Sequence, residues 1–105
     1  MGLKNAEKKR AALPLSSDVT KTFQKDWDRL SKSGRYDMNR LKEVVVMLVA
    51  NNGPLPPEYL DHALSGKTWA NHRECHIGGD FLLIYRISQT EVVFVRAGTH
   101  AELFE

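Results

Sequence analysis

The stretch HRECHIGGDFLLIYRI, residues 72–87, decides the fold because it holds two strand patterns on either side of a tight turn. The glycine pair Gly78-Gly79 between the two patterns is typical of a β-hairpin. Alternation assigns the first strand to two faces: Arg73, Cys75 and Ile77 to one, and His72, Glu74 and His76 to the other. If the apolar set packs on a core, a row rich in imidazole faces outward, and Asp80 follows the turn.

The second half of the hairpin, Phe81–Ile87, is apolar at nearly every position. Such a run predicts the central strand of a sheet that is covered on both faces. After a short turn at Ser88-Gln89-Thr90, residues Glu91–Arg96 form a third strand pattern. The second half of the chain is therefore predicted to be a three-stranded meander.

Two amphipathic helices are predicted before the hairpin. The first begins at an N-cap on Ser17 or Asp18 and ends at Ser33-Gly34. The second runs from Asp37 to about Ala50, where Asn51-Asn52-Gly53-Pro54 ends it. The apolar stripe of the first helix is Val19, Phe23, Trp27 and Leu30, and that of the second is Met38, Leu41, Val45 and Leu48. The short connection between them favours a helical hairpin.

The order of elements predicts a small α+β domain. Residues 1–15 are assigned to a basic leader that ends in a candidate first strand at Ala11–Leu15, and residues 16–105 to a single domain. Residues 55–67, rich in Pro, Gly and Ser, are expected to be an ordered loop. We expect an N-terminal strand and a two-helix hairpin packed on one face of an antiparallel sheet.

Composition limits the classes of protein to consider. The chain has 105 residues, 42% hydrophobic and 27% charged, which is ordinary for one globular domain and too apolar for a disordered chain. It contains no apolar run long enough to span a membrane. The lone Cys75 cannot form an internal disulfide, which fits a reducing cytoplasm. A net charge of +2 is compatible with RNA or an acidic protein as the partner.

All four histidines fall in the second half of the chain, on predicted loops or strand ends: His62, His72, His76 and His100. Imidazole exchanges protons near neutral pH. Two imidazoles and a carboxylate would suit phosphodiester cleavage, in which one group deprotonates the attacking hydroxyl and another protonates the leaving oxygen. Arginine side chains would steady the charge on phosphorus, and the candidates for this contact are Arg73, Arg86 and Arg96.

A metal site is the main competing chemistry. His72 and His76 are four residues apart, but on a strand their side chains stand roughly 13 Å from each other, too far to share one zinc ion. Cys75 is predicted to point to the opposite face and to be a core thiol, not a nucleophile. We therefore expect neither a metal nor another cofactor.

Five segments of the second half form a specific series by their order and spacing: Tyr59–Gly66, Trp69, Arg73–His76, Asp80–Arg86 and Arg96–Phe104. They resemble the YafQ branch of the RelE/ParE toxin superfamily, whose members are the toxins of bacterial type II toxin–antitoxin pairs. The likeness extends from about Ser16 to Phe104.

The resemblance implies a RelE-like fold and a metal-independent endoribonuclease that enters the ribosomal A site and cuts mRNA, so inhibiting translation. Attack by the ribose 2′-hydroxyl would leave a cyclic phosphate and a free 5′-hydroxyl. The family's active positions fall on His62, His76, Asp80, His100 and Phe104. His100 would be the general acid, with Asp80 or His76 as the base. His62 would contact the phosphate, and Phe104 would hold a base or the C-terminal segment.

Three positions depart from the family pattern. Gly78-Gly79 stands where relatives carry Glu-Pro, which loosens the turn before Asp80. Phe81 replaces a common Trp, and His72 stands where a Tyr is frequent, so His72 is left outside the expected site.

The resemblance also implies partners and leaves two alternatives open. A cognate antitoxin would neutralise the toxin, DNA would be reached only through that antitoxin, and no membrane is involved. The first alternative is a non-enzymatic ParE-like toxin that binds DNA gyrase. The second is an inactive toxin that serves only as an antitoxin or repressor partner. The histidines with Asp80 favour the enzyme, because a pure binder needs no proton-transfer groups. Codon specificity and complex stoichiometry are left open by the sequence.

Overall fold

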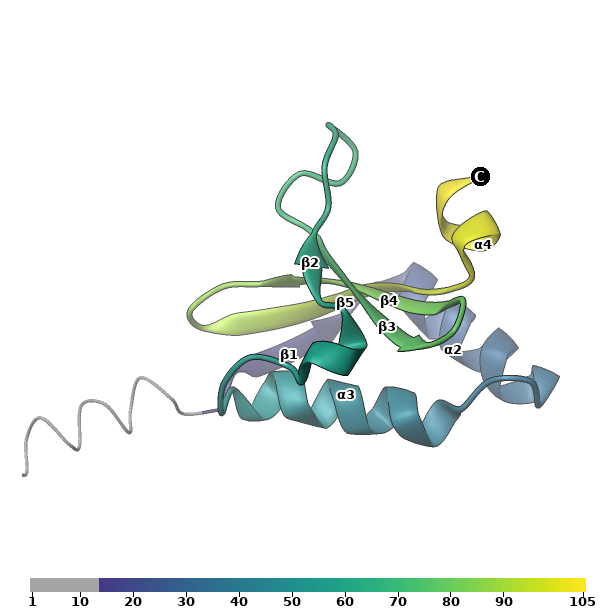
Figure 1. Cartoon of the computed structure of the whole chain (residues 1–105), viewed down its shortest axis with the longest axis horizontal. Coiled ribbons are helices and arrows are strands. Elements are labelled where there is room, and N and C mark those ends of the chain that lie inside the picture. The colour runs from purple at the N-terminus through teal and green to yellow at the C-terminus, as the bar shows by residue number, and fades with distance from the viewer. Residues whose placement is uncertain (1–13) are drawn as a thin grey trace, which may run out of the picture.

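The computed structural model describes residues 14–105, which form a five-stranded sheet with two long helices on one face (Figure 1). The α+β class predicted from the sequence is confirmed. The elements in chain order are β1 (Ser16–Val19), α2 (Lys21–Ser33), α3 (Met38–Ala50), the 3-10 turn η1 (Pro57–Tyr59), β2 (His62–Ala63), β3 (Arg73–Gly78), β4 (Phe81–Ile87), β5 (Glu91–Gly98) and α4 (His100–Phe104).

The predicted meander is confirmed, since β3, β4 and β5 are antiparallel neighbours and β4 lies at the centre of the order β1-β5-β4-β3-β2. A two-residue β2, inside the segment expected to be a loop, extends the sheet on the far side of β3. On the other edge, β1 pairs in parallel with β5, so the sheet is mixed and not purely antiparallel.

The first strand lies later in the chain than the predicted Ala11–Leu15. It covers Ser16–Val19, and residues 11–13 of the prediction lie outside the described part of the chain. Pro14 has no backbone N–H to give to a ladder, whereas Ser16 N–H donates to the Thr90 carbonyl at 3.0 Å. The polar Ser-Ser-Asp run hid this strand, because an exposed edge strand needs no apolar alternation.

Helix α2 accordingly begins later than predicted, with Thr20 as its N-cap instead of Ser17 or Asp18. The Thr20 hydroxyl accepts the Phe23 backbone N–H at 2.9 Å and donates to the Val95 carbonyl at 2.7 Å. One side chain therefore caps the helix and ties it to β5. The C-terminal signal was read correctly, because Gly34 takes the left-handed conformation with φ 69°.

Helix α3 matches its prediction at both ends. The Asp37 side chain accepts the Arg40 backbone N–H, and Asn51 ends the helix with φ 56°. Two of the four predicted stripe residues, Leu41 and Leu48, are buried, while Met38 and Val45 are only half-buried. Val44, outside that stripe, is buried as well.

Two cores lie on opposite faces of the sheet, which confirms that β4 is covered on both sides. The larger core is between the sheet and the two long helices and includes Phe23, Leu30, Leu41, Cys75, Ile77, Leu83, Tyr85 and Phe94. The smaller core consists of Leu82, Ile84 and Leu103, with Leu64, Trp69 and Val95 packed against it. Helix α4 packs on this smaller core through Leu103. This helix was not predicted from the sequence.

The loop between β2 and β3 and the short helix α4 rise on the face of the sheet opposite the long helices (Figure 1). They flank the strand ends that carry the histidines. Within residues 14–105, no helix is long and apolar enough to cross a lipid bilayer.

Candidate functional site

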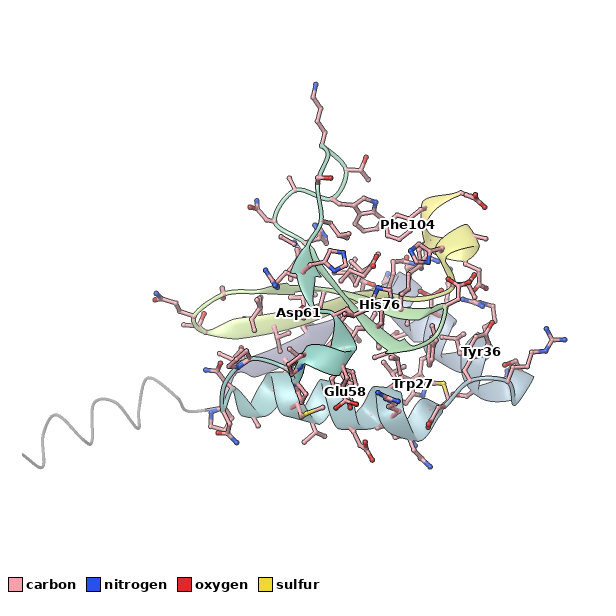
Figure 2. All side chains as sticks on the ribbon, in the orientation of Figure 1. Trp27, Tyr36, Glu58, Asp61, His76 and Phe104 are labelled. Carbon is pink, nitrogen blue, oxygen red and sulfur yellow. The ribbon has the colours of Figure 1, made fainter. Side chains whose placement is uncertain are left out.

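Three histidines from three different segments form a row on the sheet face that the long helices leave uncovered. Their ring centroids are 6.2 Å apart between His62 and His76, and 6.2 Å apart between His76 and His100. His62 comes from β2, His76 from β3 and His100 from the first turn of α4. Figure 2 shows His76 and Phe104 on the side of the sheet away from Trp27 and Glu58. The structure thus brings together three predicted site residues that are far apart in the sequence.

Pairing between β2 and β3 explains the first half of the row. His62 lies opposite Glu74 in the antiparallel register, and His76 is the next residue on the same face of β3. The predicted alternation is confirmed, because Cys75 and Ile77 are fully buried in the larger core.

Asp80 holds His100 with two hydrogen bonds. The Asp80 Oδ1 atom accepts the backbone N–H of His100 at 3.0 Å and lies 2.7 Å from its Nδ1. Gly79 takes the left-handed conformation with φ 54°, and this turns the chain so that Asp80 faces α4. The backbone and side-chain hydrogen bonds from His100 lower the pKa of Asp80 below its ordinary value. Asp80 therefore carries a negative charge beside this imidazole.

Glu74 is a site residue that the sequence prediction did not include. Its side chain is buried, and its Oε1 lies 3.6 Å from His62 Nε2 and 3.5 Å from His76 Nε2. Alternation had placed Glu74 on the same face as His76, but only the β2–β3 pairing shows that it sits between two imidazoles. Glu74 therefore lies within ion-pair distance of both rings.

Local contacts fix which ring nitrogens are available. His62 Nδ1 lies 2.7 Å from the Leu60 carbonyl oxygen, which can only accept, so this nitrogen carries a hydrogen. In the same way, the Asp80 carboxylate requires a hydrogen on His100 Nδ1. Nε2 of each ring is then the atom that takes up or releases a proton.

Aromatic side chains border the row on the side of α4. The Phe104 ring centroid is 5.8 Å from that of His100 and 5.7 Å from that of Trp69. A pocket of about 530 Å³ lies between the 65–69 loop and α4, lined by both of these aromatic residues. His72 packs edge-on against Trp69 at 5.3 Å and contacts the Ala70 carbonyl. No ring contact of His72 with the other histidines is found among residues 14–105.

The three predicted arginines are not gathered at the row. Arg73 pairs with Asp61 at 2.9 Å, and Arg96 pairs with Asp26 at 2.8 Å. The pKa values of Arg73 and Arg96 are both raised, chiefly by hydrogen bonds to the carboxylate that each one pairs with. Arg86 is exposed on β4. Leu82 of that strand pairs with His76, and Arg86 lies four residues beyond Leu82. Arg86 is therefore roughly 13 Å along the strand from the level of His76.

Asp61 connects the chain before β2 to the larger core. It accepts hydrogen bonds from Arg73 and from the hydroxyl of Tyr85, which is fully buried. Because Asp61 immediately precedes His62, this partly buried network fixes the position of the first histidine of the row.

The described residues contain no group of three or more His, Cys, Asp or Glu side chains arranged to hold a metal ion. The chemistry that this arrangement supports is proton transfer: two imidazoles share a buried carboxylate, and a third is bonded to an ionised aspartate.

The family model for the YafQ bacterial toxins of type II toxin–antitoxin systems matches residues 15–105 of this chain. Among curated proteins, the mRNA interferase toxin YafQ of Escherichia coli strain K12 is 41% identical over 76 residues. The aligned part is 72% of this chain and 82% of that protein.

Two solved structures are similar over most of their length. The E. coli DinJ–YafQ toxin–antitoxin complex contains a chain with a TM-score of 0.79 and 35% identity, and the match covers 89% of this chain and 100% of that one. A metal-bound toxin from Helicobacter pylori has a TM-score of 0.74 and 41% identity, with 86% of this chain and 99% of that one covered.

Proposed function

Since this chain belongs to the YafQ family of bacterial type II toxins, we propose that it is an mRNA interferase toxin, an endoribonuclease that cuts messenger RNA. The E. coli relative is named for this activity, and its aligned part covers more than two thirds of each chain. The DinJ–YafQ complex supports a cognate antitoxin as the partner that neutralises this toxin.

The observation that carries the proposal is the row of His62, His76 and His100. Cleavage through the ribose 2′-hydroxyl needs one group to remove a proton and another to supply one, on opposite sides of the same phosphate. Rings spaced 6.2 Å apart along one open face allow a phosphodiester to meet more than one imidazole at once. A protein that acted only by binding would not need this arrangement.

His100 is the general acid in this proposal. Asp80 Oδ1 accepts its Nδ1 hydrogen, so the ring is held in one orientation with Nε2 directed away from Asp80. His100 Nε2 then gives its proton to the departing 5′-oxygen as the phosphorus–oxygen bond breaks. The products are a 5′-hydroxyl and a cyclic phosphate.

His76 is the general base. The Asp80 oxygen near the row is engaged by both the backbone and the ring of His100, which favours His76 over Asp80 for this role. His76 accepts the 2′-hydroxyl proton, and the buried Glu74 carboxylate at 3.5 Å stabilises the imidazolium that forms. His62 lies on the other side of Glu74 and contacts the scissile phosphate.

The remaining predicted contacts lie outside the row. Phe104 offers a ring face to a nucleobase beside the scissile phosphate, and Trp69 supports that ring. Arg86 is exposed on β4, the neighbour of β3 in the sheet, and can contact the RNA backbone. Arg73 and Arg96, each paired with a carboxylate, contribute positive potential from the edges of the site.

The substrate in this proposal is mRNA in the ribosomal A site, and the site of action is the cytoplasm. The open face fits an RNA strand better than a free small molecule, since the histidine row lies on an open sheet face between the β2–β3 loop and α4. DNA is contacted only through the antitoxin, and no membrane takes part.

Mapping of mRNA 5′ ends on translating ribosomes tests the proposal. We expect codon-phased cuts with the unaltered chain, and at least a 100-fold loss of cleavage rate for His100→Gln, because the leaving oxygen then receives no proton. His72→Gln is the matched control, since this histidine lies outside the row and should retain full cleavage. The toxin is treated with EDTA and then freed of it before it meets the ribosomes, because the H. pylori relative was captured with metal. Full cleavage by the EDTA-treated toxin supports a reaction that needs no metal bound to the toxin.

The same experiment separates the alternatives. Intact mRNA together with blocked DNA supercoiling would indicate a gyrase-binding toxin. Intact mRNA without any growth inhibition would indicate an inactive toxin that serves only as a partner of the antitoxin. Unchanged cleavage by His100→Gln would overturn the assignment of the general acid.

A further inference from the structure

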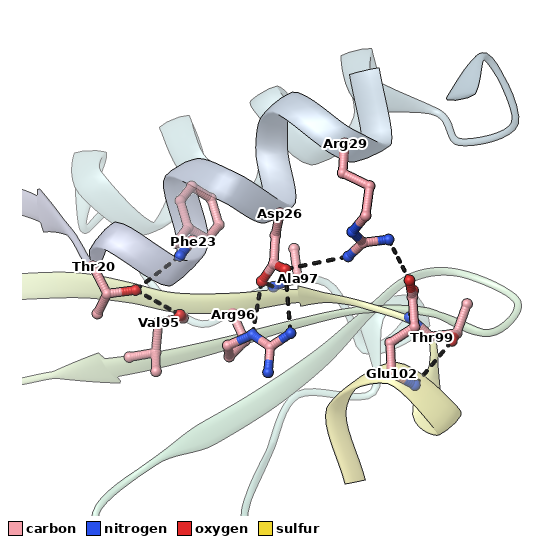
Figure 3. A network of polar contacts seen from close by, with 9 residues as sticks. All are labelled: Thr20, Phe23, Asp26, Arg29, Val95, Arg96, Ala97, Thr99 and Glu102. Carbon is pink, nitrogen blue, oxygen red and sulfur yellow. Dashed lines mark hydrogen bonds and ion pairs between the residues drawn. The ribbon is translucent and has the colours of Figure 1, made fainter. Parts of the chain in front are cut away.

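Asp26 is a buried carboxylate on α2 that does not contact the histidine row. Only 4% of the residue is exposed. Its two oxygens accept the Nε and Nη2 hydrogens of Arg96 at 2.8 and 3.2 Å and the backbone N–H of Ala97 at 3.1 Å. Because the pairing of β1 stops at Phe94, Asp26 takes the place of a strand partner for the last part of β5 (Figure 3).

A second arginine extends this network toward the site. Arg29, one turn further along α2, donates from Nη2 to Asp26 at 3.2 Å and from Nη1 to Glu102 on α4 (Figure 3). Arg29 therefore spans the gap between the long helix and the short helix that carries His100. Among residues 14–105, it is the one residue of α2 that forms a polar bond to α4.

Glu102 links this contact to the position of His100. Its Oε1 accepts the Thr99 backbone N–H at 2.9 Å, and the Thr99 hydroxyl accepts the Glu102 N–H, so the two form a capping box around the first turn of α4. His100 lies in that turn, between the two members of the box. The other Glu102 oxygen takes the Arg29 bond.

We propose that Arg29 and Glu102, anchored by Asp26, form a clamp that positions α4 and thereby sets the His100 imidazole against Asp80. Both are positioning residues, because neither touches the row itself. The inference rests on the proposed function of His100 and extends it to a region outside the site.

The size of α4 explains why such a clamp matters. The helix covers only five residues, too short to hold its own shape in water, and Leu103 is its one buried apolar anchor. The capping box fixes only the local geometry of the helix. Outside the helix, Asp80 bonds to His100 and the Phe104 ring packs against Trp69. The Arg29 contact adds a further fixed point, on α2. Misplacement of a catalytic group by about 1 Å can cost 100-fold in rate.

The clamp is tested with Arg29→Met, Glu102→Gln and the double variant. Glu102→Gln keeps a side-chain oxygen for Thr99 and removes the charge that pairs with Arg29. We expect the single-turnover cleavage rate at saturating ribosome complex to fall about tenfold in each single variant. The ribosome concentration at half-maximal rate should not change. The double variant should be no slower than either single variant, because both remove the same contact.

A second readout follows the geometry of the acid without using activity. The hydrogen bonds from His100 lower the Asp80 pKa, so a loosened α4 should raise that pKa toward its ordinary value. A carboxyl NMR titration of the isolated chain measures this change. A purely stabilising role for the pair would lower the urea midpoint and leave the Asp80 pKa unchanged.

Lys32→Met is the matched control. Lys32 pairs with Asp28 on the exposed face of the same helix and reaches no other element in that pair. It should change neither the cleavage rate nor the Asp80 pKa. Arg29→Lys, which keeps a positive charge near Glu102, should recover part of the lost rate.

The two readouts separate failure of the clamp from failure of the proposed function. If the unaltered chain does not cut mRNA, the proposed function fails, while the Asp80 titration still tests the clamp. If the unaltered chain cuts mRNA and both single variants cut at the same rate with an unchanged Asp80 pKa, the clamp is overturned.

Discussion

At the scale of single residues, the two buried carboxylates of this fold have different tasks. Glu74 lies between the Nε2 atoms of two imidazoles on the open face, where the proposed reaction would use its charge in proton transfer. Asp26 is occupied by two arginines and a backbone N–H, and its charge holds segments together. A buried carboxylate is retained only with such partners, because removing one from water is costly.

Asp26→Asn should change how stability depends on pH. Burial raises the pKa of Asp26, but hydrogen bonds from Arg96, the Ala97 backbone and Arg29 outweigh it, so the net pKa is lowered. Since the folded-state pKa is below the unfolded one, the stabilisation is present above about pH 3.9 and is lost as pH falls toward the folded value.

We expect Asp26→Asn to lower the free energy of unfolding at pH 7 by about 3 kcal/mol, since Arg96 is left without its charged partner. The variant should also lose the part of the acid sensitivity that comes from Asp26. Urea unfolding at several pH values between 3 and 7 measures both effects. An acid limb as steep as that of the unaltered chain would contradict this account of Asp26.

At the scale of elements, signals that lie close together in the sequence were predictable, and signals between distant residues were not. The helix capped by Asp37 and the β3–β4 hairpin follow from residues a few positions apart. The two turn residues of that hairpin are Gly79 and Asp80, one position later than the predicted Gly78-Gly79. The cap at Thr20 depends on where β1 ends, and β1 is defined by its pairing with β5. The sequence alone could not show that pairing, because the strand itself is polar.

The same distinction applies to the site. His62, His76, Asp80 and His100 were expected from motifs, and the structure places them near one another. Glu74 was missed because its importance depends on the two-residue β2, which has no strand pattern of its own. The Asp26–Arg96 pair, 70 positions apart in the chain, has no local signal at all.

The double role of Thr20 gives a prediction for the start of α2. Thr20→Ala removes both the helix cap and the bond to the Val95 carbonyl, and should lower the free energy of unfolding by about 2 kcal/mol. Thr20→Ser keeps the hydroxyl and should cost much less. Urea denaturation of the two variants compares them directly, and equal losses would show that the Thr20 methyl group, not the hydroxyl, stabilises this junction.

At the scale of the whole molecule, Cys75 reports on the larger core. Its thiol is fully buried on β3, and burial raises its pKa to about 12. Neither access nor ionisation then allows it to react in the folded state. We expect no modification by a thiol reagent at pH 8 unless the chain unfolds globally, with a labelling rate that increases with urea in step with unfolding. Rapid labelling in the absence of urea would show that β3 opens locally.

The parallel pairing of β1 with β5 has a kinetic consequence. Thr20, directly after β1, bonds to Val95, which is 75 positions further along the chain. The sheet is therefore incomplete until β1 pairs with β5, the strand farthest from it in the sequence. Such long-range contacts slow folding, because a large loop must be ordered before any bond rewards it. Refolding measured by stopped flow should therefore be a millisecond-to-second process.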